Sequence, residues 1–300
     1  MKHLGLIDGD ELLYKTGFAS QHTNWVVSKA DGTHLFTAKS KSAAIESIGT
    51  TDEDLQLSTE IEVASEKTAQ ILLHRFLKYM RSIVQWNDYR IYITGEGNFR
   101  EKIATLLPYK GNRDNAVKPV HYPMLREYLF DMFKAQLIEG MEADDAMSIT
   151  QWHHYRDHSS NWTTTICSQD KDLNMVPGAH YNPRGSRVER INDLDARFFF
   201  YCQLLAGDKS VDYIPGIPGV GLKSAAKILK NLYDSPNAYI YEHVVNTYAA
   251  AMEDPKIGPK FDGEDTGAED RVVEVAQLIW MLDNPNMEMW EPYKDYYGLG

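Results

Sequence analysis

The feature that most constrains this chain is a repeated pattern in which a short strand-like segment ends in carboxylates. Residues 4–7 form an apolar run that leads directly into Asp8-Gly9-Asp10. Residues 163–167 are rich in β-branched side chains and lead into Asp170 and Asp172. Such runs are typical of buried strands, and open α/β sheets bind their ligands at the carboxyl ends of the strands. The pattern therefore predicts a sheet that brings acidic side chains to one edge.

Helical and strand-like patterns alternate along much of the chain. Apolar residues recur at helical spacing over residues 65–86, and residues 89–94 then alternate like a strand. A peripheral hairpin is expected around Asp31-Gly32, and further helices are expected over residues 122–134, from about Glu142, and over residues 193–205. This alternation predicts an α/β fold, in which helices flank a central, mainly parallel sheet.

Composition sets the class of protein. With 300 residues, 43% of them hydrophobic, the chain can bury one large core or two closely joined ones. Its two cysteines and short N-terminal apolar run favour a cytoplasmic protein without disulfides or membrane contact. The formal charge of -12 alone argues against nucleic-acid binding, because neutralising phosphates usually calls for basic side chains. A carboxylate-lined metal site beside a local basic stripe would make such a charge compatible with nucleic-acid binding.

The acidic side chains that follow the strand-like segments form four short clusters: Asp8; Glu142, Asp144 and Asp145; Asp170 and Asp172; Asp208 and Asp212. Each cluster alone could be a turn, a favourable charge at a helix N-terminus or an exposed pair. Together, in one pocket, like charges require compensating cations. With oxygen ligands and neither histidine nor cysteine nearby, the set favours Mg²⁺ or Mn²⁺. Two ions roughly 3.5–4 Å apart could clamp an in-line phosphoryl displacement.

The balance of charge turns basic between residues 100 and 126. Arg100, Lys110 and Arg113 lie in this segment, together with Tyr109. Cations next to an aromatic side chain that can stack on an unpaired base are typical of elements that grip single-stranded nucleic acid. The alternative is an ordinary solvated loop, which charge-rich stretches often are.

A glycine-rich turn precedes a good helix-forming segment at residues 216–226. Gly219 and Gly221 would let the main chain approach a phosphate, amides at the start of the following helix would donate to it, and Lys223 would add charge. Carbonyl groups of such a turn can also hold a monovalent cation such as K⁺. The alternative is a simple helix-capping loop, since a Gly-x-Gly-x-Lys pattern occurs in many proteins.

The ordered set of motifs resembles the 5′-nucleases, a PIN-like family of 5′-to-3′ exonucleases and flap endonucleases, and is most similar to the stand-alone bacteriophage exonucleases. The motifs span residues 4 to about 230: Ile7-Asp8-Gly9, Asn98-Phe99-Arg100, Tyr109-Lys110-Gly111-Asn112-Arg113, Glu142-Ala143-Asp144-Asp145, Asp170-Lys171-Asp172, and Gly207-Asp208 through Ala225.

The resemblance implies a domain organisation and an activity. A PIN-like nuclease core would occupy residues 1–190, with a helical arch at about 98–126. A helical C-terminal region, residues 191–300, would carry a helix-two-turns-helix (H3TH) element at about 207–232. The enzyme would hydrolyse DNA by a two-metal-ion mechanism and leave 5′-phosphate products. Its partners would be double-stranded DNA with 5′ ends, nicks or flaps, RNA paired to DNA, and replication proteins. If a phage encodes it, it would act in the host cytoplasm.

The resemblance also implies roles for individual residues. Glu142, Asp144, Asp145 and Asp170 would surround one metal ion, and Asp170, Asp172, Asp208 and Asp212 the other. Asp8 would act close by, partly through water. Arg100, Lys110 and Arg113 would lie in the arch and steer the scissile phosphate, so that Asp8, Arg100 and Lys110 take part in catalysis. Gly219, Gly221 and Lys223 would hold the duplex, with K⁺ at the H3TH turn.

Two departures from the family pattern leave alternatives open. Family members often carry an aspartate after the second strand, where this chain has Thr94-Gly95-Glu96, so either Glu96 substitutes or one ligand is missing. Asp208 and Asp212 are four residues apart instead of three, a spacing that would still place both on one face of a helix. A DNA-end or junction binding protein that has lost cleavage, or a related metal-dependent ribonuclease, is therefore the alternative function.

Overall fold

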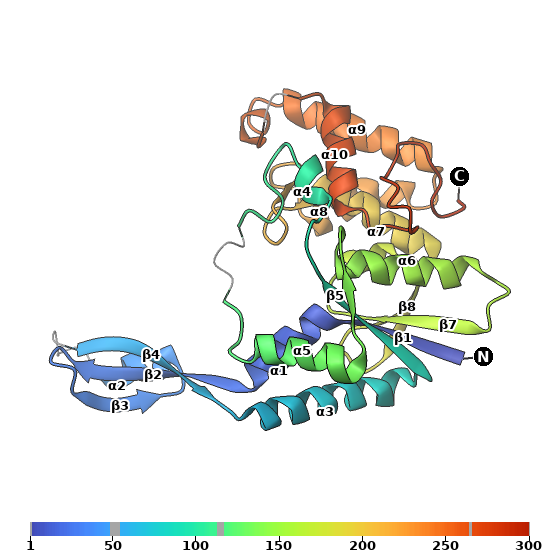
Figure 1. The fold of residues 1–300 in the computed structure, drawn as a ribbon. Helices are drawn as coiled ribbons and strands as arrows, with labels where there is room; N and C mark the ends of the chain where they lie inside the picture. Colours follow the sequence, from blue (N-terminus) through green and yellow to red (C-terminus); the bar gives the residue numbers. More distant parts are fainter. Residues whose placement is uncertain (1, 49–54, 113–116, 264–265, 300) are drawn as a thin grey trace. The chain divides into compact units, whose positions relative to one another are not determined.

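The chain folds into two compact units, as a computed structural model of residues 2–48, 55–112, 117–263 and 266–299 describes them (Figure 1). Unit 1 comprises residues 1–10, 80–116 and 135–300, and unit 2 comprises residues 11–79 and 117–134. The region from residue 191 onwards thus belongs to the same unit as the central sheet. The boundary expected at residue 190 does not separate two compact units.

Unit 1 is built on a six-stranded sheet. Its strands in spatial order are β6 (Gln136–Ile138), β5 (Asp88–Thr94), β1 (Lys2–Asp8), β7 (Trp162–Cys167), β8 (Gly178–Tyr181) and β9 (Val188–Ile191). All neighbours pair in parallel except β8 and β9. The prediction of an α/β fold with a mainly parallel sheet is therefore confirmed.

The central strands are buried where their sequences carry apolar residues. Ile7 in β1 pairs with Ile91 in β5 and with Cys167 in β7, and all three side chains are buried. A strand that is covered on both faces carries such an apolar run instead of alternating residues. Because β1, β5 and β7 are parallel neighbours, their carboxyl ends meet at one edge of the sheet.

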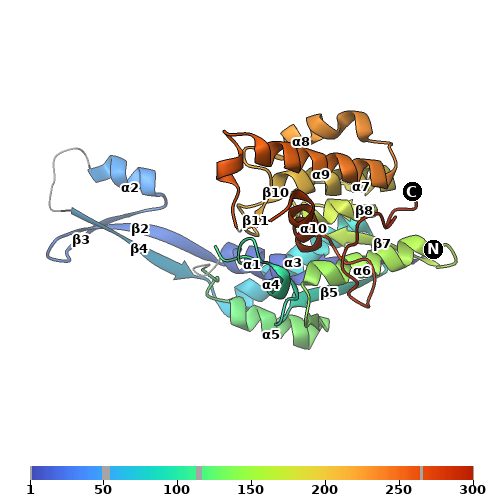
Figure 2. The same ribbon diagram turned by 90° about the horizontal axis from the view of Figure 1, so that it is seen from above.

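Helices and short strands complete unit 1 (Figure 2). They are α4 (Arg100–Ile103), α6 (Ala143–Arg156), the 3-10 helix η1 (Asp172–Met175), α7 (Asp193–Ala206), β10 (Gly207–Asp208), β11 (Ile214–Pro215), α8 (Leu222–Leu229), η2 (Lys230–Leu232), α9 (Asn237–Glu253), η3 (Gly258–Lys260) and α10 (Ala268–Ile279). Helix α6 packs on β7, β1 and β5. Helix α7 contacts η1, α8, α9 and α10, and so joins the C-terminal helices to the sheet.

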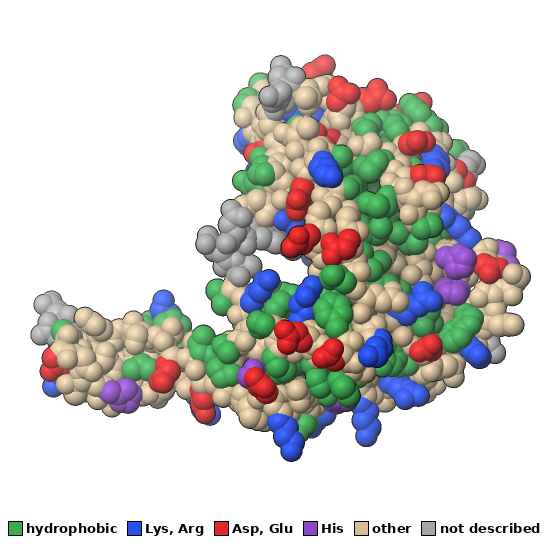
Figure 3. All heavy atoms as spheres, viewed as in Figure 1, with side chains coloured by type: hydrophobic (Ala, Val, Ile, Leu, Met, Phe, Trp, Pro, Cys, Tyr) green, Lys and Arg blue, Asp and Glu red, His purple; other side chains and the backbone are tan. Residues whose placement is uncertain are grey.

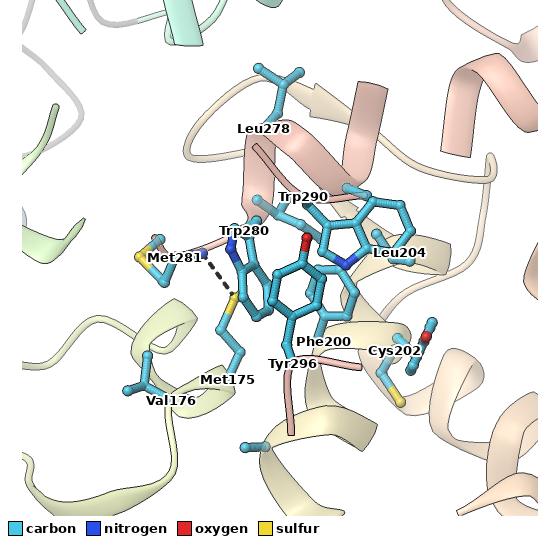
Figure 4. Packing of buried hydrophobic residues seen from close by; sticks show 14 of the residues in the cluster. Met175, Val176, Phe200, Cys202, Leu204, Leu278, Trp280, Met281, Trp290 and Tyr296 are labelled. Carbon is cyan, nitrogen blue, oxygen red and sulfur yellow. Dashed lines mark hydrogen bonds between the residues drawn. The ribbon is translucent and has the colours of Figure 1, made fainter. Parts of the chain in front are cut away.

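An aromatic cluster lies at the centre of the C-terminal part of unit 1 (Figure 4). The Trp280 ring lies edge-on to Phe200, with 5.2 Å between centroids, and 4.6 Å from the ring of Tyr296. Met281 donates its backbone N–H to the sulfur of Met175, at 3.3 Å. Large aromatic side chains contribute most of the apolar area in such a core, which fixes α7, α10 and η1 against one another.

Unit 2 combines four helices with a small antiparallel sheet. Its elements are most of α1 (Gly9–Ala19) and α3 (Glu66–Val84), all of α5 (Tyr122–Phe133), the sheet strands β2 (Gln21–Lys29), β3 (His34–Ala38) and β4 (Leu55–Val63), and α2 (Lys41–Ile48). Tyr14 of α1 contacts Tyr122 of α5, and His74 of α3 contacts Tyr128 of α5. The hairpin expected around Asp31-Gly32 is the connection between β2 and β3, and Gly32 has a φ of 87° there.

Gly9 offers a direct test of how the end of β1 is packed. A Cβ atom at this position would lie 2.5 Å from the carbonyl oxygen of Tyr92 and 2.7 Å from the side chain of Ile93. We therefore expect Gly9→Ala to lower the free energy of unfolding by about 1–3 kcal/mol, the usual cost of overpacking. Chemical denaturation would measure it. Gly221→Ala is the matched control, since nothing lies within 4 Å of its Cβ position. Equal stability of the two variants would contradict the packing argument.

Candidate metal centre

The strand ends bring acidic side chains together at the carboxyl edge of the sheet. Asp8 is the last residue of β1, and its carboxylate accepts a hydrogen bond of 2.9 Å from the hydroxyl of Ser168, which follows β7. The same hydroxyl accepts a hydrogen bond of 3.0 Å from the backbone N–H of Asp170. Ser168 thus fixes Asp8 and the loop that carries Asp170 relative to each other.

The first turn of α6 supplies a second group of acids. Glu142 precedes the helix, and its backbone N–H donates to the Asp145 carboxylate at 3.1 Å. A carboxylate at this helix position is favoured by the unpaired amides and by the helix dipole. Asp144 lies on the same turn and is half-buried. Of the three carboxylates, those of Glu142 and Asp144 remain available to the centre.

Asp145 is instead occupied by Arg100. The guanidinium of Arg100 donates to both carboxylate oxygens, at 2.6 and 2.8 Å, and both side chains are fully buried. Arg100 also donates to the carbonyl oxygens of Leu278 and Trp280, each at 2.7 Å. Both residues depart from the expected roles, because Arg100 has no surface with which to touch DNA and Asp145 has no free oxygen for a metal ion. They form an internal clamp.

Asp170 and Asp172 follow β7 in a tight turn. The backbone N–H of Asp172 donates to the Asp170 carboxylate at 2.8 Å, and Asp172 begins the helix η1. The buried amide of Gln203 in α7 donates to Asp172 at 2.6 Å. These contacts turn the Asp172 side chain inward while Asp170 stays exposed.

Asp208 and Asp212 lie in a loop, so the expectation of a helical pair is wrong. Helix α7 ends at Ala206, and Gly207 follows with a φ of 62°, so close to the backbone of Gly216 that a Cβ atom would not fit. Asp208 then pairs in β10, and a single turn closes where the N–H of Asp212 donates to the carbonyl oxygen of Asp208 at 3.1 Å. The turn still places both acids beside the centre.

The electrostatics show that the clusters converge. Burial raises the pKa of Asp144 well above its usual value of 3.8, and the charges of Asp8, Asp170 and Glu142 raise it further. Burial, and then the charge of Asp170, raises the pKa of Asp172 to about 6. A carboxylate raises the pKa of another only when it lies nearby. The acids from distant parts of unit 1 therefore share one site.

The pKa of Asp170 indicates that the loop after β10 also lies beside the centre. Desolvation raises this pKa, and among the neighbouring charges Asp212 also raises it, although the hydrogen bond from the backbone of Asp172 acts in the opposite direction. Asp208 likewise contributes to the raised pKa of Asp172. Asp170 therefore lies close enough to interact electrostatically both with Asp144 and with Asp212.

Two lysines lie among these carboxylates. Lys110 forms salt bridges with Glu142 and, at 3.7 Å, with Asp212. Lys171 forms salt bridges with Asp208 and, at 3.1 Å, with Asp172. Although burial opposes it, Lys110 is the main reason why the pKa of Glu142 is lowered.

Tyr109 also contacts the acidic side chains of the centre. Its hydroxyl donates to Glu142 at 2.7 Å, and burial raises its pKa well above 10. The ring is therefore engaged with the centre, whereas the sequence suggested that it stacks on an unpaired base. The neighbouring backbone N–H of Lys110 donates to the carbonyl oxygen of Asp212, at 2.9 Å. Segment 109–112 is thereby held against the loop after β10.

The residues present fit a hard divalent cation. The donors are carboxylates, and burial together with neighbouring negative charges raises the pKa values of Asp144 and Asp172. The buried Oε1 of Gln203, next to Asp172, has no hydrogen-bond partner among the residues that the structure describes. Within the same residues, no three acidic, histidine or cysteine side chains already converge closely enough to hold an ion. Binding would therefore require these side chains to reorient.

The expected DNA-binding residues lie at the surface of the turn before α8. Gly219, Gly221 and Lys223 are exposed, and open space surrounds the Cβ position of both glycines. Gly219 has a φ of 81°, which favours glycine. This backbone is accessible to a phosphate group. Arg113, the remaining basic residue expected to contact DNA, lies outside the described residues, as does part of the expected arch at 98–126.

Three polar residues at the centre were missed by the sequence interpretation. Ser168 and Gln203 orient Asp8 and Asp172, and no local pattern marks either of them. Asp10 accepts a hydrogen bond of 2.9 Å from the N–H of Thr94, so its carboxylate lies at the end of β5, the position for which Glu96 was the expected ligand. The Asp8-Gly9-Asp10 spacing was the available signal for this residue. Glu96, the expected substitute, is exposed.

Surface charge is mixed on the face seen in Figure 3. Acidic and basic side chains alternate there, and no large patch of one sign is visible. Part of the acidic excess lies instead in the half-buried carboxylates described above. No described helix has the length and apolar character needed to span a membrane.

Comparison with curated proteins finds two partial relatives. DNA polymerase I of Bacillus caldotenax is 29% identical over 160 residues, which are 45% of this chain and 17% of the polymerase. DNA polymerase I of Rhizobium leguminosarum is 33% identical over 105 residues, which are 32% of this chain and 10% of the polymerase. The chain thus corresponds to a small part of each polymerase. No protein-family model matches it.

Solved structures match nearly the whole chain. The bacteriophage T5 5′-exonuclease with bound divalent metal ions (zinc) has a TM-score of 0.50 at 18% identity, covering 93% of this chain and 89% of that chain. The bacteriophage T5 flap endonuclease, in a pseudo-enzyme–product complex with DNA and metal ions, has a TM-score of 0.53 at 17% identity, covering 95% and 90%. The fold that the resemblance implies is therefore confirmed, because the chain folds like these two bacteriophage T5 enzymes.

Proposed function

We propose that this chain is a divalent-metal-dependent 5′-to-3′ exonuclease with flap-cutting activity on duplex DNA. The observation that carries the proposal is the convergence of Asp8, Asp144, Asp170 and Glu142, from three separate segments, at the carboxyl edge of a parallel sheet. The fold shared with an exonuclease and a flap endonuclease that were crystallised with metal ions supports it. DNA in one of those structures supports the choice of substrate.

The residues that would hold two Mg²⁺ or Mn²⁺ ions are Asp8, Glu142, Asp144, Asp170, Asp172, Asp208 and Asp212. Bound ions would neutralise the phosphodiester and lower the pKa of the attacking water. Ser168 donates a hydrogen bond to the Asp8 carboxylate, and Gln203 donates one to that of Asp172, so neutral donors hold both residues near the centre. Lys110 would contact the scissile phosphate. Hydrolysis would leave a 5′-phosphate and a 3′-hydroxyl.

The turn before α8 would grip the duplex. The exposed backbone at Gly219 and Gly221 can approach a phosphate, and Lys223 adds a charge beside the first turn of α8. Carbonyl groups of this turn would hold K⁺. Duplex grip favours DNA over free single-stranded RNA, although RNA paired to DNA would still fit. Replication proteins are the expected partners.

Product sizing on matched substrates tests this function. The wild type and Asp170→Ala would be incubated with 5′-labelled blunt, nicked and 5′-flapped duplexes in Mg²⁺ and in EDTA. We expect short 5′ products from the wild type in Mg²⁺ alone and none from Asp170→Ala. Binding without cleavage would instead support a DNA-end or junction binding protein. Cleavage of free single-stranded RNA alone would support a ribonuclease.

A further inference from the structure

Lys171 lies where its charge neutralises two acids of the centre, Asp172 and Asp208. Its ammonium group forms salt bridges with Asp208 and, at 3.1 Å, with Asp172. The two carboxylates belong to residues that are 6% and 4% exposed, respectively, and they come from segments far apart in the chain. Among the described residues, Lys171 is the cation within salt-bridge distance of both.

The other hydrogen-bond partners that the described residues supply to these two carboxylates are neutral. Gln203 donates to Asp172 at 2.6 Å, and the backbone N–H of Val211 donates to Asp208 at 3.2 Å. Hydrogen bonds from neutral donors orient a carboxylate but do not cancel its charge. Two buried like charges side by side are costly unless a cation lies between them. Lys171 therefore stabilises the centre when it holds no metal ion.

The side chain of Lys171 can leave without a change in the fold. It is 41% exposed, and its four-carbon stem is flexible. Lys171 also lines a cavity of about 540 Å³, together with Asp170, Asn182 and Arg184. An ammonium released from Asp172 and Asp208 thus has a hydrated space to enter, since polar side chains line much of this cavity.

We propose that Lys171 is a tethered counter-ion that competes with a divalent cation for Asp172 and Asp208. Occupation of this half of the centre then requires the ammonium to be displaced, which lowers the affinity for the metal ion. The same contact keeps the two carboxylates together in its absence. The inference rests on the proposed function, because it takes these two aspartates as metal ligands.

Calorimetric titration with Mn²⁺ tests the competition. Lys171→Met keeps an unbranched, flexible side chain of nearly the same length and removes its charge, so we expect the weaker Mn²⁺ site to bind about tenfold more tightly than in the wild type. In EDTA the same variant should melt at a lower temperature, and Mn²⁺ should then raise its Tm more than that of the wild type. Lys171→Arg, which keeps the charge, should bind Mn²⁺ like the wild type.

Lys209→Met is the matched control. Lys209 is close in sequence but forms its salt bridge with Asp262, at 2.6 Å, away from the two carboxylates. Its Mn²⁺ affinity should equal that of the wild type. Unchanged or weaker Mn²⁺ binding by Lys171→Met would overturn the competition and leave the nuclease function standing if the wild type still cleaves. Failure of every protein to bind Mn²⁺ would overturn both.

Discussion

Replacing Asp144 with asparagine is expected to abolish metal-dependent cleavage and, at the same time, to raise the Tm of the metal-free protein. Burial and the charges of Asp8, Asp170 and Glu142 raise the pKa of Asp144, so its ionised form is destabilised in the native state. Asparagine has the same shape without the charge. Loss of about 4 kcal/mol of transition-state stabilisation would lower the cleavage rate about a thousandfold.

The pH dependence of the Tm difference tests whether charge repulsion at Asp144 causes it. A group whose pKa is higher in the native than in the unfolded state contributes stability below its unfolded pKa, and this contribution is lost as the pH rises through its native pKa. For Asp144 the unfolded value is close to 3.8. The Tm advantage of Asp144→Asn in EDTA should therefore grow as the pH rises through the raised native pKa and should disappear as the pH falls towards the unfolded value of 3.8.

Thermal melts in EDTA across this pH range, with single-turnover cleavage in Mg²⁺, would measure both effects. Asp131→Asn is the control, because Asp131 is an exposed carboxylate in α5. It should leave both the Tm and the cleavage rate at the wild-type values. A lower Tm for Asp144→Asn in EDTA would show that its carboxylate is held by favourable contacts, and the charge repulsion would then be refuted.

The fold was predictable where the sequence pattern is long and apolar. The strand β1 and the helix α3 follow directly from hydrophobic periodicity, and so does the convergence of acids after β1 and β7. The strands β6, β8 and β9 were not predicted, because segments of three or four residues contain too little periodicity to be recognised. Their place in the sheet depends on pairing with residues distant in sequence.

The candidate site was predictable as a set of acids but not as a set of contacts. Asp208 and Asp212 have a spacing that suits a helix, yet Gly207 ends α7 and places them in a turn. Arg100 stands in a basic segment, which suggested contact with DNA. Its burial depends on Asp145 and on carbonyl groups 178 and 180 residues further along the chain. Such long-range partners have no signature in the local sequence.

Loss of the Arg100 guanidinium is expected to be the most destabilising single change at the centre. Arg100 joins α4 to the first turn of α6 through Asp145 and to the end of α10 through the carbonyl oxygens of Leu278 and Trp280. Arg100→Ala would leave the Asp145 carboxylate buried without its cation. Breaking a buried pair by removing one partner costs about 3–5 kcal/mol, which should appear as a lower midpoint in urea unfolding followed by tryptophan fluorescence.

Further variants separate the clamp from a role in DNA binding. Arg100→Lys keeps the charge but cannot form two parallel hydrogen bonds, so it should lose part of the stability while the Kd for duplex DNA stays unchanged. Joint replacement by Arg100→Met and Asp145→Leu removes both charges and should recover much of the loss seen with Arg100→Ala. Lys102→Ala, an exposed cation of the same helix, should leave the stability unchanged. If Arg100→Lys weakened DNA binding at unchanged stability, Arg100 would have to reach the substrate, and its burial as a clamp would be refuted.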